Sequence, residues 1–142
     1  MGTDGCASNN DQDLFREMDM VAKLHKVSTL DPTVMDAAAV LRMATADGAR
    51  ALGLGDITGS LETGKTADLI VVDTRQPHLS PLYHPASQLV YAARGSDVRH
   101  VIVAGKPLVE NRKLLTIDTA HVMKKVKALS RKIGASNSSF VS

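Results

Sequence analysis

Aromatic residues are scarce in this chain of 142 residues: they make up 3% of it, as two Tyr and two Phe, and Trp is absent. The core must therefore be aliphatic, built from Leu, Val, Ile, Ala and six Met. Cysteine is nearly missing too, because Cys6 is the only one. A single cysteine excludes an internal disulfide framework, which suits a reducing compartment. The content of 44% hydrophobic and 23% charged residues still indicates a globular protein.

Long apolar runs and a strong excess of one charge are also lacking. No stretch approaches the roughly 18 apolar residues of a membrane span, and the N-terminus is polar where a signal peptide would be basic and then apolar. We therefore expect a cytoplasmic protein that binds no membrane. The net charge is only +2, and its basic excess lies mostly in Lys124, Lys125, Lys127, Arg131 and Lys132. These cations on one predicted helix indicate a solvated face, whereas a nucleic-acid-binding surface would be wider and interleaved with aromatic residues.

The spacing of apolar residues divides the chain into helical and extended parts. Three- and four-residue steps predict helices in the first half, and β-branched runs with turn residues between them predict strands in the second. We expect helices at 13–26, 31–47, 49–52, 88–93 and about 119–133. We expect strands at 67–73, 98–103 and 108–111, a short strand within 59–65, a loop at 74–86 and a frayed tail from Gly134. The class is α/β, but helices precede strands without regular alternation, which is typical of two partial units joined together.

The segment Gly2-Thr3-Asp4-Gly5 holds the first candidate for chemistry. A carboxylate at the carboxyl end of a barrel strand points into the face where such enzymes keep their active sites. There it can bind a metal ion and accept a proton from a bound water. Asp-Gly is also a common turn sequence, so the tetrapeptide alone leaves both interpretations open.

Several segments after Asp4 resemble one family. Ser8-Asn9-Asn10, Leu41 to Thr45, Gly48 to Gly53, Gly59 to Leu69, Pro81-Leu82-Tyr83 and Val98 to Gly105 are similar to the metal-dependent amidohydrolases. The stretch Gly-Ser-Leu-Glu…Gly-Lys…Ala-Asp within 59–68 is specific for that superfamily. The Ser-Asn-Asn element resembles more narrowly the deaminases that act on 5-methylthioadenosine and S-adenosylhomocysteine, and the related chlorohydrolases.

The resemblance implies a C-terminal piece of an amidohydrolase TIM barrel with part of its small β-sandwich domain. Residues 1–55 would be the end of strand 8 and the following helices, 56–116 the partial β-sandwich, and 117–142 a C-terminal helix with its tail. The implied reaction is hydrolytic deamination of a purine nucleoside by a water bound to one divalent metal ion, zinc. Asp4 is then the catalytic residue, a metal ligand and a substrate contact.

The other ligands that the resemblance requires are missing. The family supplies a His-x-His pair and two further histidines from strands before the eighth, and no histidine precedes Asp4. A catalytic zinc needs about three protein ligands, so we expect this chain to be inactive alone and to lose the metal. We also expect exposed sheet edges and an uncovered apolar face on residues 14–25, which predict self-association.

Other side chains have mainly structural explanations. His78 and His84 lie in a Pro-rich loop without ligand spacing, and Cys6 has no neighbouring histidine in the sequence to activate it. Ser8 to Asn10 could contact substrate, but capping of the next helix is the simpler role. Asp68 is expected to hold backbone N–H groups of a turn.

The alternatives to a deaminase fragment are a non-catalytic accessory or interaction domain, and a piece of a chlorohydrolase or another aminohydrolase.

Overall fold

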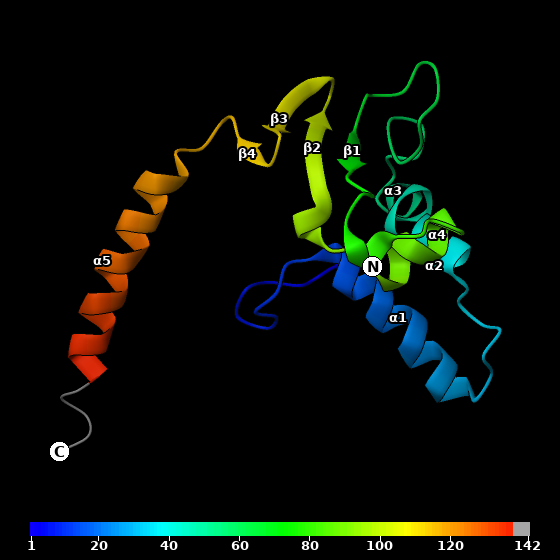
Figure 1. The fold of residues 1–142 in the computed structure, drawn as a ribbon, viewed down its shortest axis with the longest axis horizontal. Coiled ribbons are helices and arrows are strands. Elements are labelled where there is room, and N and C mark those ends of the chain that lie inside the picture. The colour runs from blue at the N-terminus through cyan, green and yellow to red at the C-terminus, as the bar shows by residue number, and fades with distance from the viewer. Residues whose placement is uncertain (138–142) are drawn as a thin grey trace.

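The computed structural model describes residues 1–137. Four short helices form one layer, a four-stranded antiparallel sheet stands beside them, and a long helix extends away from both (Figure 1). The helices are α1 Leu14–Thr29, α2 Ala37–Ala44, α3 Ala46–Ala51, α4 Pro85–Tyr91 and α5 Thr119–Asn137, with 3₁₀ turns η1 Pro77–Leu79 and η2 Gly95–Asp97. The strands are β1 Leu69–Val72, β2 Val98–Val103, β3 Lys106–Glu110 and β4 Lys113–Leu114. The predicted α/β class is confirmed, but the tail is helical from Gly134 to Asn137, and 138–142 lie outside the described residues.

Helix α1 begins where the sequence predicts, but its buried face is different. Asp13 is the N-cap, and its Oδ1 accepts a hydrogen bond of 3.0 Å from the backbone N–H of Phe15. Phe15, Met18 and Ala22 are buried against α2 and α4. The prediction of an uncovered apolar face on residues 14–25 is confirmed at Leu24, which is exposed together with His25, and wrong at Met18, which is buried. The aromatic side chain of Phe15 buries more apolar area than the aliphatic side chains beside it. This favours the observed rotation of α1 about its axis, which turns Phe15 toward the core.

Helix α2 starts later than Asp31-Pro32 predicts. The Asp31 side chain accepts hydrogen bonds from both the backbone N–H and the hydroxyl of Thr33, which closes a turn instead of capping a helix. Met35 then has φ = 49°, a left-handed conformation that a helix cannot contain. Asp36 is the true N-cap, because its Oδ1 accepts from the N–H of Ala39 at 2.7 Å.

The break after α2 falls at Thr45 and not at Gly48. Thr45 has φ = −126° and ψ = −100°, outside the helical region, and Gly48 lies inside α3. A Cβ at position 48 would lie 3.0 Å from the carbonyl oxygen of Met43. Gly48 therefore permits close approach of the two helices instead of ending one.

The sheet has the order β1-β2-β3-β4, with every neighbouring pair antiparallel. The predicted strands 98–103 and 108–111 are confirmed and form a hairpin, but the second begins earlier, at Lys106. Ala104 and Gly105 both have positive φ, which gives a two-residue connection. Strand β4 was not predicted, and none of the described residues 59–65 form a strand.

Strand β1 is an edge strand, although an apolar, β-branched run such as 67–73 is typical of a strand buried on both faces. It pairs with β2 alone among the described elements. Ile70 is 49% exposed and Val71 is 43% exposed. The apolar run 67–73 predicted the strand correctly, but no second layer within the described chain covers it.

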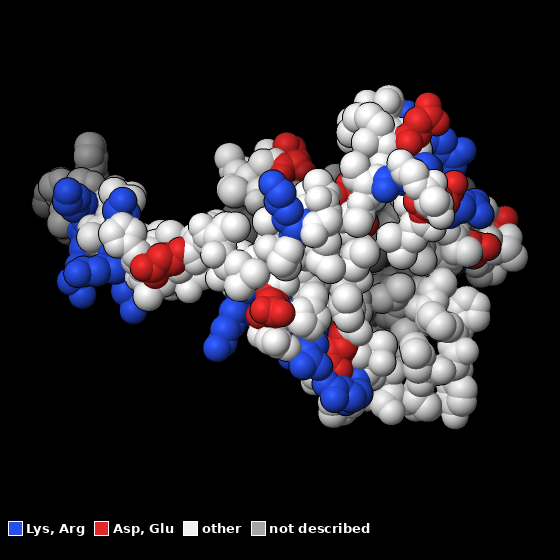
Figure 2. Space-filling view, turned by 90° about the horizontal axis from the view of Figure 1, so that it is seen from above, with Lys and Arg blue, Asp and Glu red and all other residues white. Residues whose placement is uncertain are grey.

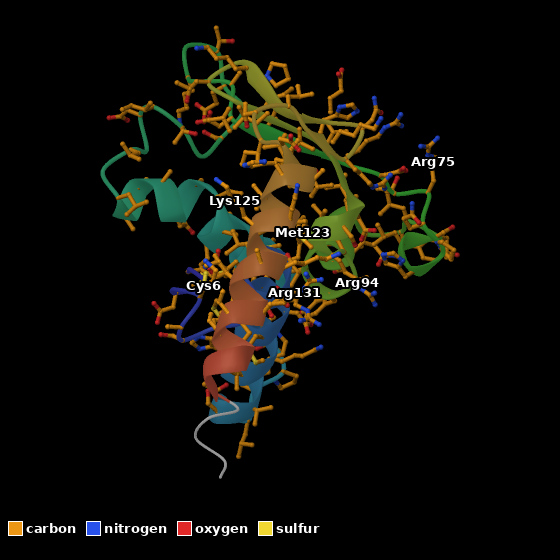
Figure 3. The ribbon with its side chains drawn as sticks, turned by 90° about the vertical axis from the view of Figure 1, so that its left-hand side faces the viewer. Cys6, Arg75, Arg94, Met123, Lys125 and Arg131 are labelled. Carbon is orange, nitrogen blue, oxygen red and sulfur yellow. The ribbon has the colours of Figure 1, made fainter. Side chains whose placement is uncertain are left out.

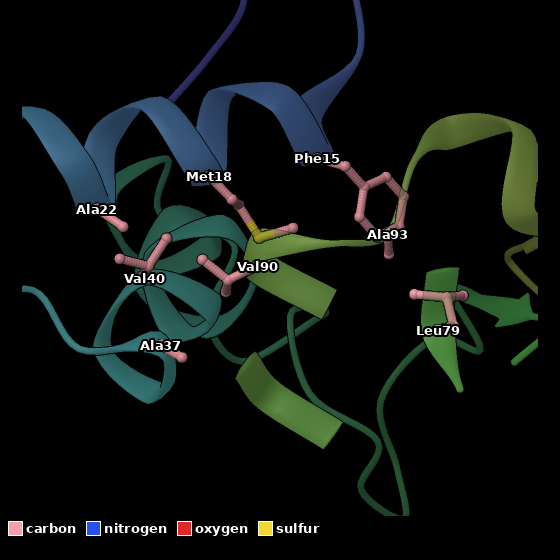
Figure 4. Packing of buried hydrophobic residues seen from close by; sticks show 8 residues of the cluster. All are labelled: Phe15, Met18, Ala22, Ala37, Val40, Leu79, Val90 and Ala93. Carbon is pink, nitrogen blue, oxygen red and sulfur yellow. The ribbon is translucent and has the colours of Figure 1, made fainter. Parts of the chain in front are cut away.

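The core lies within the helical layer and is aliphatic apart from one ring. Its buried members are Phe15, Met18, Ala22, Ala37, Val40, Leu79, Val90 and Ala93 (Figure 4). Leu79 is 1% exposed although it comes from the predicted loop 74–86, because η1 turns it inward. Helix α4 begins at Pro85, three residues before the prediction, with His84 as its N-cap.

No helix among residues 1–137 is both long and apolar enough to cross a membrane.

Candidate functional site

Asp4 lies in an exposed segment before α1, and the residues around it form turns instead of a strand. Its φ is 61°, its Oδ1 accepts a hydrogen bond of 2.7 Å from the N–H of Gly5, and its carbonyl accepts one from the Thr3 hydroxyl at 3.3 Å. The expected end of a barrel strand is therefore not formed in this chain. A strand needs hydrogen-bonding neighbours, and the described residues offer none at this point.

The residues after Asp4 connect this segment to α1. Asn9 donates from Nδ2 to Oε1 of Glu17 at 2.8 Å, and its Oδ1 accepts from the N–H of Asp11 at 3.0 Å. The prediction that Ser8 to Asn10 cap the helix is wrong, since Asp13 does so. Exposed Cys6 accepts a hydrogen bond from Gln12 Nε2 at 3.1 Å. The segment is held by polar contacts from its own neighbourhood.

The described residues do not fit a metal ion. Within residues 1–137 no three His, Cys, Asp or Glu side chains come together as a ligand group. Asp4 in particular contacts only its sequence neighbours. A zinc site needs about three protein ligands at about 2.0–2.3 Å, so no step of a metal-dependent reaction can be derived from this chain alone.

His78 and His84 each have a structural partner. Nε2 of His78 lies 2.9 Å from Oδ2 of Asp97, a carboxylate that is 4% exposed and also accepts from the N–H of Arg94 at 2.9 Å. Nδ1 of His84 accepts from the N–H of Ser87 at 3.3 Å. Asp97 is a buried charged residue that the sequence analysis missed, because Gly-Ser-Asp before a strand looks like an ordinary exposed turn.

Asp68 joins three segments, and its predicted structural role is confirmed. Its Oδ1 accepts from the backbone N–H of Ala104 in the hairpin turn at 2.6 Å. Its Oδ2 accepts from the hydroxyls of Thr58 at 2.7 Å and Thr66 at 2.9 Å. These bonds, that from Thr58 first, lower the pKa of the Asp68 carboxyl below its ordinary value of 3.8.

Replacing Asp68 by asparagine tests this role through pH. The pKa of Asp68 is lower in the folded chain than in the unfolded chain, so the unfolded chain binds more protons below about pH 4. The stability that ionised Asp68 contributes is therefore lost as the pH falls through the pKa of the folded chain. The unfolding free energy of Asp68→Asn should therefore lie below that of the original chain at neutral pH. The difference in unfolding free energy between the two proteins should narrow in urea titrations as the pH falls below about 4. A gap that does not change with pH would contradict an ionised Asp68.

Two open grooves lie beside these residues. One, of about 690 Å³, runs between the helices α1 and α2 and the strands β1 and β2, and apolar side chains such as Met18, Leu41, Ile70 and Val101 line most of it. The other, of about 750 Å³, lies between α3 and β1. Asp4 lines neither groove.

Comparison with known proteins accounts for the open surfaces. Residues 1–108 match the profile of the amidohydrolase family. A 5-methylthioadenosine/S-adenosylhomocysteine deaminase of Syntrophobacter fumaroxidans is 61% identical over 133 residues, which are 94% of this chain and 30% of the relative. The chain thus spans about a third of the length of this curated relative.

Solved structures show the same similarity to the amidohydrolase family in three dimensions. A zinc-bound adenosine deaminase from Xanthomonas campestris has a TM-score of 0.88 and 46% identity, over 92% of this chain and 30% of that one. A zinc complex of atrazine chlorohydrolase from Arthrobacter aurescens has a TM-score of 0.78 and 28% identity, over 88% of this chain and 28% of that one. Helices followed by an antiparallel sheet fit a C-terminal piece of an amidohydrolase TIM-barrel chain. The chain belongs to the amidohydrolase family.

Proposed function

We propose that the chain is the C-terminal part of a metal-dependent hydrolase that deaminates an adenosine-type nucleoside, 5-methylthioadenosine or S-adenosylhomocysteine. The observation that carries this proposal is the 61% identity to a deaminase of that name over 94% of the chain. The adenosine deaminase structure, at 46% identity, also resembles this chain more than the chlorohydrolase does at 28%. In this reaction water replaces the amino group of the purine ring, and ammonia leaves.

Asp4 is the residue that we propose for the active site of the complete enzyme, as catalytic carboxylate, metal ligand and substrate contact. Asp4 is exposed, and among residues 1–137 its hydrogen bonds go only to its neighbours Thr3 and Gly5, so it is free to serve this role instead of stabilising the chain. The complete enzyme would hold one divalent metal ion, for which the zinc-bound relatives support zinc. The isolated chain would not retain that ion.

We further propose the division into residues 1–55, 56–116 and 117–142, as barrel tail, partial β-sandwich and C-terminal helix. The sheet supports the second range, because all four strands lie within 56–116 and pair with one another. Helix α4 of the same range packs on α1 and α2, so the first two parts share the helical core. We propose a cytoplasmic location because the chain has a single cysteine, which suits a reducing compartment.

We also propose self-association through the exposed apolar faces, because side chains such as Met20, Leu24 and Val27 are more than half exposed.

The proposal predicts that the isolated chain is inactive and that a completed one is active. The 142-residue chain should bind zinc below stoichiometric amounts and release no ammonia from S-adenosylhomocysteine or 5-methylthioadenosine. A chimera, in which this chain replaces the matching segment of the Syntrophobacter fumaroxidans deaminase, should bind zinc and deaminate. The zinc content and the rate of ammonia release are measured for both proteins side by side. Turnover by the isolated chain, or a folded, zinc-loaded chimera without turnover, would refute the proposal.

A non-catalytic interaction domain is the second candidate. It is favoured by the extent of exposed apolar surface on α5, where Met123 is 55% exposed, and by the lack of a metal-ligand group in residues 1–137. An active chimera that depends on Asp4 would count against it.

A further inference from the structure

Helix α5 carries an apolar face that the rest of the described chain leaves open. Val122, Met123, Val126 and Leu129 are between 44% and 57% exposed. The helix stands apart from the body (Figure 1) and makes no extensive contact with another described helix or strand. We call these four residues the apolar face of α5. Exposed aliphatic side chains that gather on one side of a helix indicate an interaction surface.

The apolar face of α5 is broad. At 3.6 residues per turn, its side chains spread over about 120° of the helix circumference, from Leu129 on one side to Met123 on the other. A seam between two helices is narrower, because it uses only residues three and four positions apart. The apolar face is therefore wide enough to lie on an extended surface.

The remaining circumference of α5 carries charge of one sign. The helix contains five Lys or Arg residues and no Asp or Glu. Lys and Arg side chains gather at this end of the molecule in Figure 2, and Figure 3 shows Met123, Lys125 and Arg131 along the helix. A helix on which exposed aliphatic side chains lie beside cations alone fits a partner that is both apolar and anionic.

The cations border the apolar face on both of its sides. By the helical spacing, Lys127 follows Met123 on one side, and Lys125 and Lys132 lie beside Leu129 on the other. Long Lys side chains keep their stems on the apolar surface while their ammonium groups reach outward. A broad anionic surface would meet both rows of cations at once, whereas a single acidic helix lies along one seam.

The positive charge of the chain is confined to α5. Residues 1–118 contain 15 Asp or Glu and 12 Lys or Arg, which gives them a net charge of −3 with histidine neutral. An anionic surface would therefore attract α5 and repel the body of the molecule. This charge distribution orients the chain with α5 against such a surface and the helical layer and sheet away from it.

We propose that α5 binds an anionic lipid surface, with its apolar face at the boundary between headgroups and acyl chains and its cations among the lipid phosphates. Helices with an aliphatic face and a cationic polar side are typical of those that lie in the plane of a membrane interface. The surface that fits the proposed location is the cytoplasmic leaflet, which is anionic. The proposal goes beyond the deaminase function and does not depend on it.

The proposal differs from the expectations of the sequence analysis on two points. The expectation that the chain binds no membrane rested on the lack of a spanning run, but a helix that lies in the interface needs no such run. The cations were interpreted as a solvated face because the sequence could not show that the aliphatic side chains beside them are exposed.

The test measures flotation of the full 142-residue chain with lipid vesicles in a density gradient, in which aggregated protein sinks. The chain should float with phosphatidylcholine vesicles that contain about 30% phosphatidylglycerol, and should not float with phosphatidylcholine alone. Raising NaCl from about 0.05 to 0.5 M should reduce flotation, because salt screens the attraction between the cations and the lipid phosphates.

Two substitutions to lysine separate insertion of the apolar face from attraction by charge alone. Val126→Lys puts an ammonium group in the middle of the apolar face and should weaken binding to the anionic vesicles roughly 10-fold, although it adds a positive charge. Ala128→Lys adds the same charge on the polar side of α5 and should bind at least as tightly as the original chain. Both residues are exposed, so circular dichroism should show the same fold for both variants.

Each outcome decides the proposal. Salt-sensitive flotation with anionic vesicles only, weakened by Val126→Lys and kept by Ala128→Lys, supports it. No flotation, equal flotation with neutral vesicles, flotation that salt does not change, or equal binding by the two variants overturns it. Binding to polyglutamate or to duplex DNA without binding to vesicles would assign α5 to a macromolecular partner and would also overturn it. Deamination by the chimera is measured separately, so either proposal can fail while the other stands.

Discussion

Replacing Asp4 by asparagine is expected to lower the deamination rate of the chimera about 10²–10⁴-fold, the usual contribution of a general acid–base group. The fold should not change. Asparagine tolerates the φ of 61° at this position, and its Oδ1 can still accept from the N–H of Gly5. What the substitution removes is the negative charge and the ability to take up a proton. The measurement is ammonia release under substrate saturation, with zinc content determined on the same sample.

Two controls separate loss of chemistry from loss of structure. Thermal unfolding of Asp4→Asn should match that of the unchanged chimera, because Asp4 is exposed and its contacts are local. Asp11→Asn changes another carboxylate of the same segment and should keep its rate within about threefold. Full activity of Asp4→Asn would remove Asp4 from the proposed active site.

Replacing Leu79 by alanine is expected to destabilise the chain by about 2–5 kcal/mol, the range for a buried leucine that leaves a cavity. Leu79 is 1% exposed and belongs to the core cluster with Phe15, Val40 and Val90. That cluster is small and has a single aromatic ring, so neighbouring side chains can fill little of the lost volume. Urea unfolding followed by circular dichroism measures the change.

Leu61→Ala is the matched control for that experiment. Leu61 is 75% exposed, so the same truncation should cost less than about 0.5 kcal/mol. Equal effects at positions 61 and 79 would mean that η1 does not hold Leu79 in the core.

Local signals predicted where the first and last helices begin, but not which residue caps them. Asp13 caps α1 in place of the predicted Ser8 to Asn10, and at α5 the Oδ1 of Asp118 accepts from the N–H of His121 at 3.0 Å. Where two local signals competed, the sequence could not decide between them. Asp31-Pro32 and Asp36 both look like helix starts, and the hydrogen bonds from Thr33 to Asp31 favour the second.

Tertiary surroundings account for the other misses. The apolar run of β1 is typical of a strand that is covered on both faces. The residues of the run cannot show whether the layers that would cover it are present. The same holds for Asp4, whose chemical type could be predicted but whose ligand partners could not come from this chain. Buried Asp97 depends on His78, 19 residues away, a separation that no local pattern encodes.

The two oxygens of Asp13 serve segments that are far apart in the chain. Oδ1 caps α1 and Oδ2 accepts from the N–H of Gly95 at 2.8 Å, a contact across 82 positions. A Cβ at position 95 would lie 3.1 Å from that same oxygen, so glycine allows the approach. Fraying of the first turn of α1 therefore also costs the hydrogen bond to the turn that precedes β2. This carboxylate joins the helical layer to the entry of the sheet, in addition to Val72 and Val98, which pack against the helical core.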